Sequence, residues 1–338
     1  MESKWIDKKS YCNLLCNIKA HSLYHSREWI ELIENSFNVT ASFLATYDQN
    51  SKIICVTPYF KLRKFLFILY GSPLSGLFTM FQGPIFIGNL SDLDVNKVLT
   101  SQHEFLSSRS YYIEIGFHYS NKINSSNNQL LKNNLYKIQS RTTSVINLEQ
   151  TQDFIWNNFE SRARNMVRKS IKNGVKVTKQ EMNITWVEQF YDMLNETYKK
   201  QSKRTPHPFN FYKNLIMLNN LNAVCFSATI ENKIIANAIF ITSGSELLFL
   251  SGTSNNQGMK LAANSLIQWQ AITYGIETGH SSYDFGGLGL ENIDKFKMSF
   301  NGKITQHQRL VYKSKIIKIL EPILYLLMKT KLFNITSK

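Results

Sequence analysis

Hydrophobic positions change between a helical and a strand period along the first half of the chain. Residues 24–36 repeat apolar side chains at helical spacing behind Ser26, a residue type suited to capping a helix. Two apolar runs follow at 41–47 and 52–60, and the polar residues between them favour a hairpin turn. The other elements predicted for this half are a strand at 65–70, a helix near 93–107 and a strand near 111–115.

The second half of the chain repeats this order. The predicted elements are a strand at 143–148, helices near 151–158, 160–172 and 185–200, strands at 223–231, 233–242 and 246–251, a helix near 259–278 and a strand at 283–285. Antiparallel strands between helices in both halves predict an α+β (mixed α/β) fold of two domains, each a mostly antiparallel sheet flanked by helices. We place these domains at 1–148 and 149–312 and an amphipathic C-terminal helix at 313–338.

Apolar residues and lysines alternate in the C-terminal stretch 313–333. An interfacial helix on anionic lipid and ordinary packing on the domain both fit this pattern. We find no apolar run of about 18 residues, no secretory h-region and no Cys-x-x-Cys pair. We therefore expect a cytoplasmic protein with free thiols, and a peripheral contact at the inner face of the membrane is the alternative that this stretch leaves open.

Charge separates the two halves more strongly than hydrophobicity does. The chain is 43% hydrophobic and 13% aromatic, which excludes a disordered chain, and its formal charge is +15. Residues 1–150 carry 15 basic and 11 acidic side chains (net +4), and residues 151–338 carry 24 and 13 (net +11). The positive half favours an anionic partner: nucleic acid, a nucleotide-activated substrate, coenzyme A or an anionic membrane face. A solvated, lysine-rich surface is the alternative.

A short predicted strand near the C-terminus ends in an acid and two glycines. Asp284 is followed by Gly286 and Gly287, and glycines at a strand end let the backbone approach a ligand closely. Lys295 and Lys297 come soon after and are near enough to bind an anionic group. This segment is the leading candidate for a substrate site, although Asp284 can also serve simply to cap the next turn.

The predicted helix near 160–172 carries a stripe of cations. Arg164 and Arg168 are four residues apart and share one face, whereas Arg162 and Lys169 lie on a neighbouring face. Arginine binds phosphate in a bidentate manner, so the stripe can hold a phosphorylated donor or acceptor. A solvated helix face is the competing interpretation.

The loop after the next predicted helix is basic and contains proline. Tyr198 precedes this loop and can orient a substrate or donate a proton. His207 lies within it and can act as a general base, because an unperturbed histidine has a pKa near 6.5. A lone histidine in a loop is also common without any function.

Several short motifs recur in an order that resembles one enzyme family. The first half contains Ser26-x-x-Trp29, Thr57-Pro58-Tyr59, Ser72-Pro73 and Gly83-Pro84. The second half contains Arg162-x-Arg164-x-x-x-Arg168-Lys169-x-x-x-x-Gly174-Val175, Asp284-Phe285-Gly286-Gly287 and Phe296-Lys297-x-x-Phe300-x-Gly302. From about residue 20 to residue 312, the chain resembles Fem-like acyltransferases of the GNAT superfamily.

This resemblance implies two fused GNAT-like domains and transfer of an acyl group to an amine. In the peptidoglycan branch the donor is aminoacyl-tRNA and the acceptor is a nucleotide- or lipid-linked muropeptide; other branches use an acyl thioester. We expect an N-acyltransferase that uses acyl-CoA or another acyl thioester, without a metal, to modify an amine of a cell-envelope or polysaccharide precursor. The alternatives are aminoacyl-tRNA-dependent transfer of the peptidoglycan type and a non-catalytic protein that binds RNA or membranes.

The resemblance also suggests roles for the candidate residues. We expect Asp284 to lie at the acceptor amine and Lys297 to bind an acceptor phosphate or the negative charge that develops during transfer. Arg164 and Arg168 would hold phosphates, and Tyr198 would orient the substrate. General-base help contributes about 10²–10⁴-fold to such reactions, and oxyanion stabilisation is often the larger effect.

Overall fold

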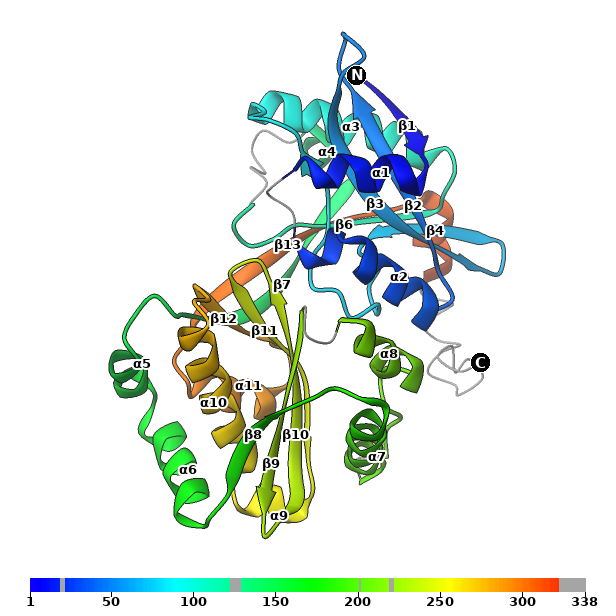
Figure 1. Ribbon diagram of the computed structural model, residues 1–338. Helices are drawn as coiled ribbons and strands as arrows, with labels where there is room; N and C mark the ends of the chain where they lie inside the picture. Colours follow the sequence, from blue (N-terminus) through cyan, green and yellow to red (C-terminus); the bar gives the residue numbers. More distant parts are fainter. Residues whose placement is uncertain (19–21, 122–128, 201, 219–221, 322–338) are drawn as a thin grey trace. The chain divides into compact units, whose positions relative to one another are not determined.

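The computed structural model describes residues 1–18, 22–121, 129–200, 202–218 and 222–321 (Figure 1). The chain divides into two compact units. Unit 1 comprises Met1–His21, Asn38–Ser140 and His307–Lys338, and unit 2 comprises Ser22–Phe37 and Arg141–Gln306. Both units are therefore discontinuous in sequence. The boundary at residue 148 stays a prediction about domains, and the compact units differ from it because each takes one segment from the other half of the chain.

Unit 1 is built on a sheet with the strand order β1-β2-β3-β4-β6-β13 and with β5 paired to β3. The strands are β1 (Glu2–Ile6), β2 (Thr40–Tyr47), β3 (Ile53–Lys64), β4 (Phe67–Ser72), β5 (Ile85–Phe86), β6 (Tyr112–Gly116) and β13 (Lys303–Lys313). The helices are α1 (Lys8–Cys16), α3 (Asp92–Ser107) and α4 (Gln129–Lys132). Neighbouring strands are antiparallel except for the parallel pair β4–β6.

Unit 2 has the strand order β7-β12-β11-β10-β9-β8. Its strands are β7 (Tyr136–Asn147), β8 (Lys176–Gln180), β9 (Ala223–Ile230), β10 (Lys233–Ser243), β11 (Glu246–Ser254) and β12 (Ser282–Gly287). Its helices are η1 (Leu23–His25), α2 (Arg27–Ser36), α5 (Gln152–Asn158), α6 (Ser161–Lys172), α7 (Ile184–Lys200), α8 (Phe209–Asn214), η2 (Leu215–Leu218), α9 (Asn256–Lys260), α10 (Ala263–Glu277) and α11 (Glu291–Met298). Among the described strands of unit 2, β11 and β12 form a parallel pair and the other neighbouring strands are antiparallel.

The two units share one order of elements. In unit 1 the antiparallel strands β2, β3 and β4 are followed by α3 and by β6, which is parallel to β4. In unit 2 the antiparallel strands β9, β10 and β11 are followed by α10 and by β12, which is parallel to β11. The predicted α+β fold with a duplicated, mostly antiparallel arrangement is confirmed.

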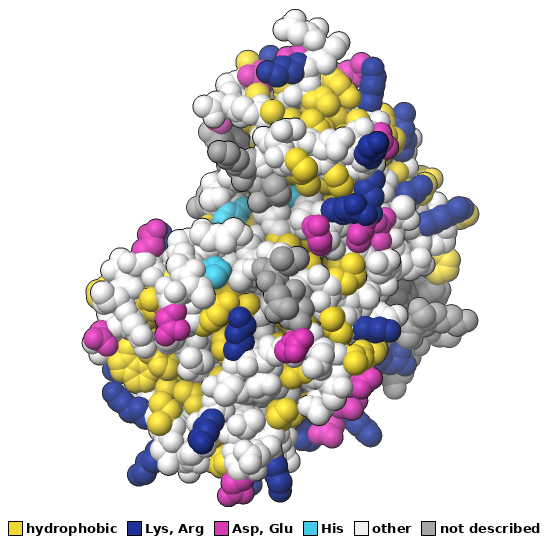
Figure 2. Space-filling model, viewed as in Figure 1, with side chains coloured by type: hydrophobic (Ala, Val, Ile, Leu, Met, Phe, Trp, Pro, Cys, Tyr) yellow, Lys and Arg dark blue, Asp and Glu magenta, His cyan; other side chains and the backbone are white. Residues whose placement is uncertain are grey.

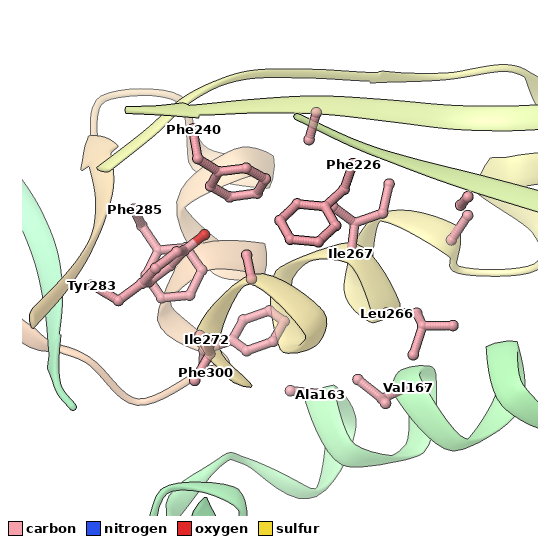
Figure 3. Close-up of a cluster of buried hydrophobic side chains, with 14 of the residues drawn as sticks. Ala163, Val167, Phe226, Phe240, Leu266, Ile267, Ile272, Tyr283, Phe285 and Phe300 are labelled. Atoms are coloured by element: carbon pink, nitrogen blue, oxygen red, sulfur yellow. The ribbon is translucent and has the colours of Figure 1, made fainter. Parts of the chain in front are cut away.

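The core of unit 2 forms around α10 (Figure 3). Aromatic side chains from three strands pack on one side of this helix, among them Phe226, Phe240 and Tyr283. On its other side, Ala163 and Val167 of α6 lie in the same apolar cluster. Because α6 buries this face, its cations are left on the solvent side.

Local signals predicted several elements correctly. The Ser26 hydroxyl accepts a hydrogen bond from the Trp29 N–H at 3.2 Å and caps α2, as predicted. The β2–β3 hairpin is also confirmed. The helix α6 ends at Lys172 with Asn173 as its C-cap, and Gly174 has φ +76°, a conformation that favours glycine.

Other elements differ from the sequence-based expectation. The single helix expected near 259–278 is wrong: α9 and α10 are separate, and Ala262 between them has φ +56°. Strand β13 was not predicted, because polar residues dominate it and it buries His307 and Arg309 beside its apolar residues. Of the C-terminal helix predicted at 313–338, residues 315–321 are helical, and residues from 322 onward lie outside the described part of the chain.

A buried ion pair between β6 and β13 organises the loop after β4. Arg309 and Glu114 are each 1% exposed and form a salt bridge. The Ser75 N–H and hydroxyl donate to the two Glu114 carboxylate oxygens at 2.9 and 2.8 Å. The Arg309 guanidinium also donates to the carbonyls of Thr79 and Met80 at 3.4 and 3.2 Å. The pair thus supplies buried hydrogen bonds to a loop that has no regular secondary structure.

Candidate active site

The end of β12 forms a fixed turn around Asp284. The Gly286 N–H donates to Asp284 Oδ1 at 2.7 Å, and the Thr143 hydroxyl contacts both Asp284 Oδ1 and the Gly286 carbonyl oxygen. Gly286 has φ +73°, and a Cβ atom there would lie 3.1 Å from the Phe249 carbonyl oxygen. Both observations explain why glycine is needed at this position. The hydrogen bonds to Asp284 Oδ1 thus hold the Gly286 backbone close to the Asp284 carboxylate.

Lys297 reaches the same turn from α11. Its Nζ donates to the Gly287 carbonyl oxygen at 2.8 Å and lies 5.8 Å from the centre of the Phe249 ring. Asp284 is 2% exposed and Lys297 is 7% exposed. Burial lowers the pKa of Lys297 to about 8, and the negative charges of Asp284 and Asp294 offset part of that effect. The carboxylate and the cation that the sequence analysis paired therefore meet at one turn.

The spacing of the segment after the turn places Lys297. The Asp294 carboxylate accepts from the Gly289 N–H at 3.0 and 2.9 Å, which fixes the start of α11 to the preceding loop. Phe300 packs against Phe285 with the ring centres 5.2 Å apart. Phe-Lys-x-x-Phe spacing thus anchors the helix in the core, so that Lys297 points to the turn.

Two residues at this site were not anticipated. Thr143 comes from β7, and the antiparallel register of β7 with β12 brings it opposite Gly287. Tyr24 comes from η1 near the N-terminus, and burial together with the negative charge of Asp284 raises its pKa well above the usual value. No local sequence signal marks either residue, because both reach the site only through tertiary contacts.

Lys295 lies away from the turn despite its proximity in sequence. Its Nζ donates to Glu291 at 2.7 Å on the exposed side of α11. Helical geometry separates positions 295 and 297 by about 200° around the axis. Its role in anion binding stays a prediction.

The cations of α6 are also engaged in different ways. Arg164 donates hydrogen bonds to the carbonyls of Asn157 and Phe159 and so stabilises the connection between α5 and α6. The Arg168 guanidinium lies 5.5 Å from the centre of the Trp156 ring. Arg162 and Lys169 are exposed. The predicted stripe therefore exists on α6, but one of its arginines already binds the protein backbone, and phosphate binding by the others stays a prediction.

Tyr198 and His207 lie among aromatic side chains. Burial raises the pKa of Tyr198, and this residue interacts electrostatically with Tyr212 of α8. The ring of His207 stands edge-on to that of Phe37, with the centres 6.2 Å apart, and burial lowers the pKa of His207 to about 4. A histidine with this pKa is neutral at pH 7 and is a weak base, so its burial does not favour His207 as a general base.

Within the described ranges, no group of three or more His, Cys, Asp or Glu side chains is arranged to hold a metal ion. The four cysteines, at 12, 16, 55 and 225, are free thiols. No helix among the described residues is both long and apolar enough to cross a bilayer.

Comparison with known proteins places this site in a family. The model of the FemAB family matches residues 127–232 and 217–308, which together cover more than half of the chain and include the Asp284 turn and α11. The chain belongs to the FemAB family. Membership confirms the predicted resemblance to Fem-like proteins.

Relatives of this FemAB protein include named enzymes. It is 24% identical over 211 residues to the lipid II:glycine glycyltransferase of Staphylococcus epidermidis, covering 44% of this chain and 50% of the relative. The enzyme of that name from Staphylococcus aureus is 23% identical over 216 residues, covering 44% and 51%. The chain spans about half the length of the curated relatives it matches.

Solved structures support the fold of this FemAB protein. The crystal structure of FemX has a TM-score of 0.71 and 15% identity and covers 95% of this chain and 100% of that one. A tandem GNAT protein from the clavulanic acid biosynthesis pathway has a TM-score of 0.53 and 6% identity and covers 92% and 98%. The prediction of two fused GNAT-like domains is therefore confirmed at the level of fold.

The comparison corrects one expectation. The curated relatives are named for the transfer of glycine, which is an aminoacyl group. The expectation of acyl-CoA or another acyl thioester as the donor is therefore wrong. The positive charge of the second half suits any phosphorylated donor, so charge alone does not distinguish an acyl thioester from aminoacyl-tRNA.

Proposed function

We propose that this protein transfers an aminoacyl group from aminoacyl-tRNA to the free amine of a lipid- or nucleotide-linked cell-envelope precursor. The names of its FemAB relatives support glycine as the first group to test and lipid II as the first acceptor. The observation that carries the proposal is the pairing of buried Asp284 and Lys297 at the Gly286–Gly287 turn.

The reaction needs charge stabilisation more than a covalent nucleophile. The acceptor nitrogen attacks the ester carbonyl and forms a C–N bond, and the carbonyl oxygen becomes negative. The C–O ester bond then breaks, the 3′ ribose oxygen takes up a proton, and the nitrogen loses one. A buried cation next to the developing oxyanion stabilises it strongly, because little water screens the interaction. Lys297 is placed for this role in the proposed mechanism.

Asp284 is better suited to positioning than to proton transfer. Its Oδ1 already accepts the Gly286 N–H, and the carboxylate is almost fully buried. Its negative charge raises the pKa of Lys297 against the effect of burial. We therefore propose that Asp284 holds the turn and keeps Lys297 protonated at neutral pH, which differs from the direct contact with the acceptor amine expected from the sequence.

The direct test supplies the full chain with tRNA carrying labelled glycine and with lipid II. Mass spectrometry should find an acceptor heavier by one glycyl residue, and the gain should depend on both substrates. Uridine-linked muropeptide and tRNA charged with other amino acids would then define the acceptor and the donor. Transfer that persists when charged tRNA is omitted, or no transfer from any charged tRNA, would contradict the proposal.

The pH dependence tests the two residues together. Lys297 is cationic below its pKa of about 8 and neutral above it, so the single-turnover rate should fall as pH rises through about 8. In Asp284→Asn the carboxylate charge that raises this pKa is absent, and the alkaline fall should move to lower pH. Rates are corrected for hydrolysis of the ester.

A carboxylate that only supported the fold would lower the rate without moving the fall. Lys297→Arg serves as the reference, since arginine stays charged to pH 12 or above and should remove the alkaline fall. An unchanged profile in both variants would exclude Lys297 as the titrating group.

A further inference from the structure

The tip of the β3–β4 hairpin in unit 1 presents two large apolar side chains to solvent. Lys64 and Phe67 form the last pair of the ladder, so Phe65 and Leu66 make a two-residue loop. Phe65 is 64% exposed and Leu66 is 81% exposed. Single exposed apolar residues are common on proteins, but two adjacent ones at a protruding tip call for an explanation.

The backbone of this loop strengthens the case. Phe65 has φ +55°, in the left-handed region. Two-residue hairpin loops favour glycine, asparagine or aspartate at such positions, and a bulky side chain there is unfavourable. The turn geometry therefore does not favour phenylalanine and leucine at these positions, and the property relevant to binding is the apolar surface that they expose.

A second apolar surface begins at the same end of the sheet. The Tyr111 N–H donates to the Ile68 carbonyl at 2.9 Å, and the Ser314 N–H donates to the Tyr111 carbonyl at 2.9 Å. The helical residues 315–321 therefore start beside the hairpin in unit 1. Ile316 and Ile319 on this helix are 50% and 70% exposed.

The segments that carry both apolar surfaces are rich in cations. These cations come from the β3–β4 hairpin, from the segment before β6 and from the segment around the helical residues 315–321. They are Lys61, Arg63, Lys64, Arg109, Lys313, Lys315 and Lys318. The acidic residue in these same segments is Glu321, which forms a salt bridge with Lys313. Basic and hydrophobic side chains lie beside one another on the right-hand margin of unit 1 in Figure 2. This surface, which we call the hairpin surface, is apolar at its tips and positive around them.

We propose that the hairpin surface docks on an anionic lipid membrane. Phe65 and Leu66 enter the boundary between headgroups and acyl chains, and the surrounding cations contact lipid phosphates. Nucleic acid fits less well, since three of the four exposed apolar residues, Leu66, Ile316 and Ile319, offer no aromatic face for a base, and Phe65 alone does not form a stacking platform. The proposal extends the membrane contact expected for 313–333, of which 322–333 lie outside the described residues. It stands independently of the proposed chemistry, because its test measures binding alone.

The test uses the double variant Phe65→Gly/Leu66→Ser of the full chain. Sedimentation with vesicles of phosphatidylglycerol and phosphatidylcholine should retain the unchanged protein, and binding by the variant should weaken about tenfold or more. Glycine suits the positive φ at position 65, so the temperature of unfolding should stay the same or rise. A loss of binding with retained stability separates membrane contact from a folding defect.

Matched controls lie elsewhere in unit 1. Leu93→Ser removes a leucine that is 63% exposed near the start of α3, on the order of 20 Å along the helix from the end that leads to Tyr111, and should leave binding unchanged. Arg63→Glu should weaken binding and reduce its salt dependence, whereas Lys9→Glu in α1 should not.

Three outcomes would overturn the proposal. One is equal sedimentation with vesicles of phosphatidylcholine alone and with anionic vesicles. Another is unchanged binding by the double variant. The third is a protein that does not bind vesicles but self-associates in a way the double variant abolishes, which would assign the hairpin surface to a second copy of the chain.

Discussion

Lys297→Ala should lower the single-turnover rate of aminoacyl transfer about 10²–10³-fold, the loss typical of removing one preorganised group that stabilises an oxyanion. The side chain is buried at the Gly286–Gly287 turn, so its positive charge acts in a region from which water is largely excluded. Binding of the acceptor should change much less than the rate, because the charge develops in the transition state. Rapid-quench measurements at saturating acceptor would separate the two.

Lys233→Ala is the matched control, since it removes an exposed lysine at the start of β10 in the same unit. It should leave the rate unchanged. Lys297→Ala should still fold but with a lowered unfolding midpoint, because the buried carboxylate of Asp284 loses a neighbouring cation. A variant at position 297 that folds normally and transfers at the full rate would remove Lys297 from the mechanism.

Glu114→Gln in unit 1 should destabilise the protein by about 3–5 kcal/mol, the cost of leaving one partner of a buried ion pair uncompensated. Arg309 keeps its positive charge when its anionic partner becomes neutral, and both residues are almost fully buried. The amide also has one oxygen in place of two, so it cannot accept both hydrogen bonds from Ser75. Denaturant unfolding monitored by circular dichroism would measure the change.

The double variant Glu114→Gln/Arg309→Met should recover part of that loss, because it removes the unpaired charge as well. Glu291→Gln breaks the exposed pair with Lys295 and should have no measurable effect on unfolding. Equal destabilisation by the single and double variants in unit 1 would show that the hydrogen bonds to Ser75, and not the ion pair, account for the cost.

Contiguous segments made part of the site predictable. Asp284, Gly286 and Gly287 follow one another on a short strand, and Lys297 lies one position after a core phenylalanine, so local spacing was enough to select them. Lys295 was selected by the same proximity, but the helix turns it to solvent and to Glu291. Position in sequence did not indicate which of the two lysines faces the turn; that depended on which side of α11 packs into the core.

The sequence alone predicted many of the elements, their duplicated order and the resemblance to the family, because hydrophobic period, turn residues and short motifs are local properties; it missed β13 and the break between α9 and α10. Tertiary structure decided which strands complete each unit and which distant residues reach Asp284. Thr143 arrives through the register of β7 with β12, and Tyr24 arrives with the helical segment that unit 2 takes from the N-terminal region. Arg309 finds Glu114 through the pairing of β13 with β6. Such partners are far apart in sequence, and only burial of the shared core selects one pairing among many.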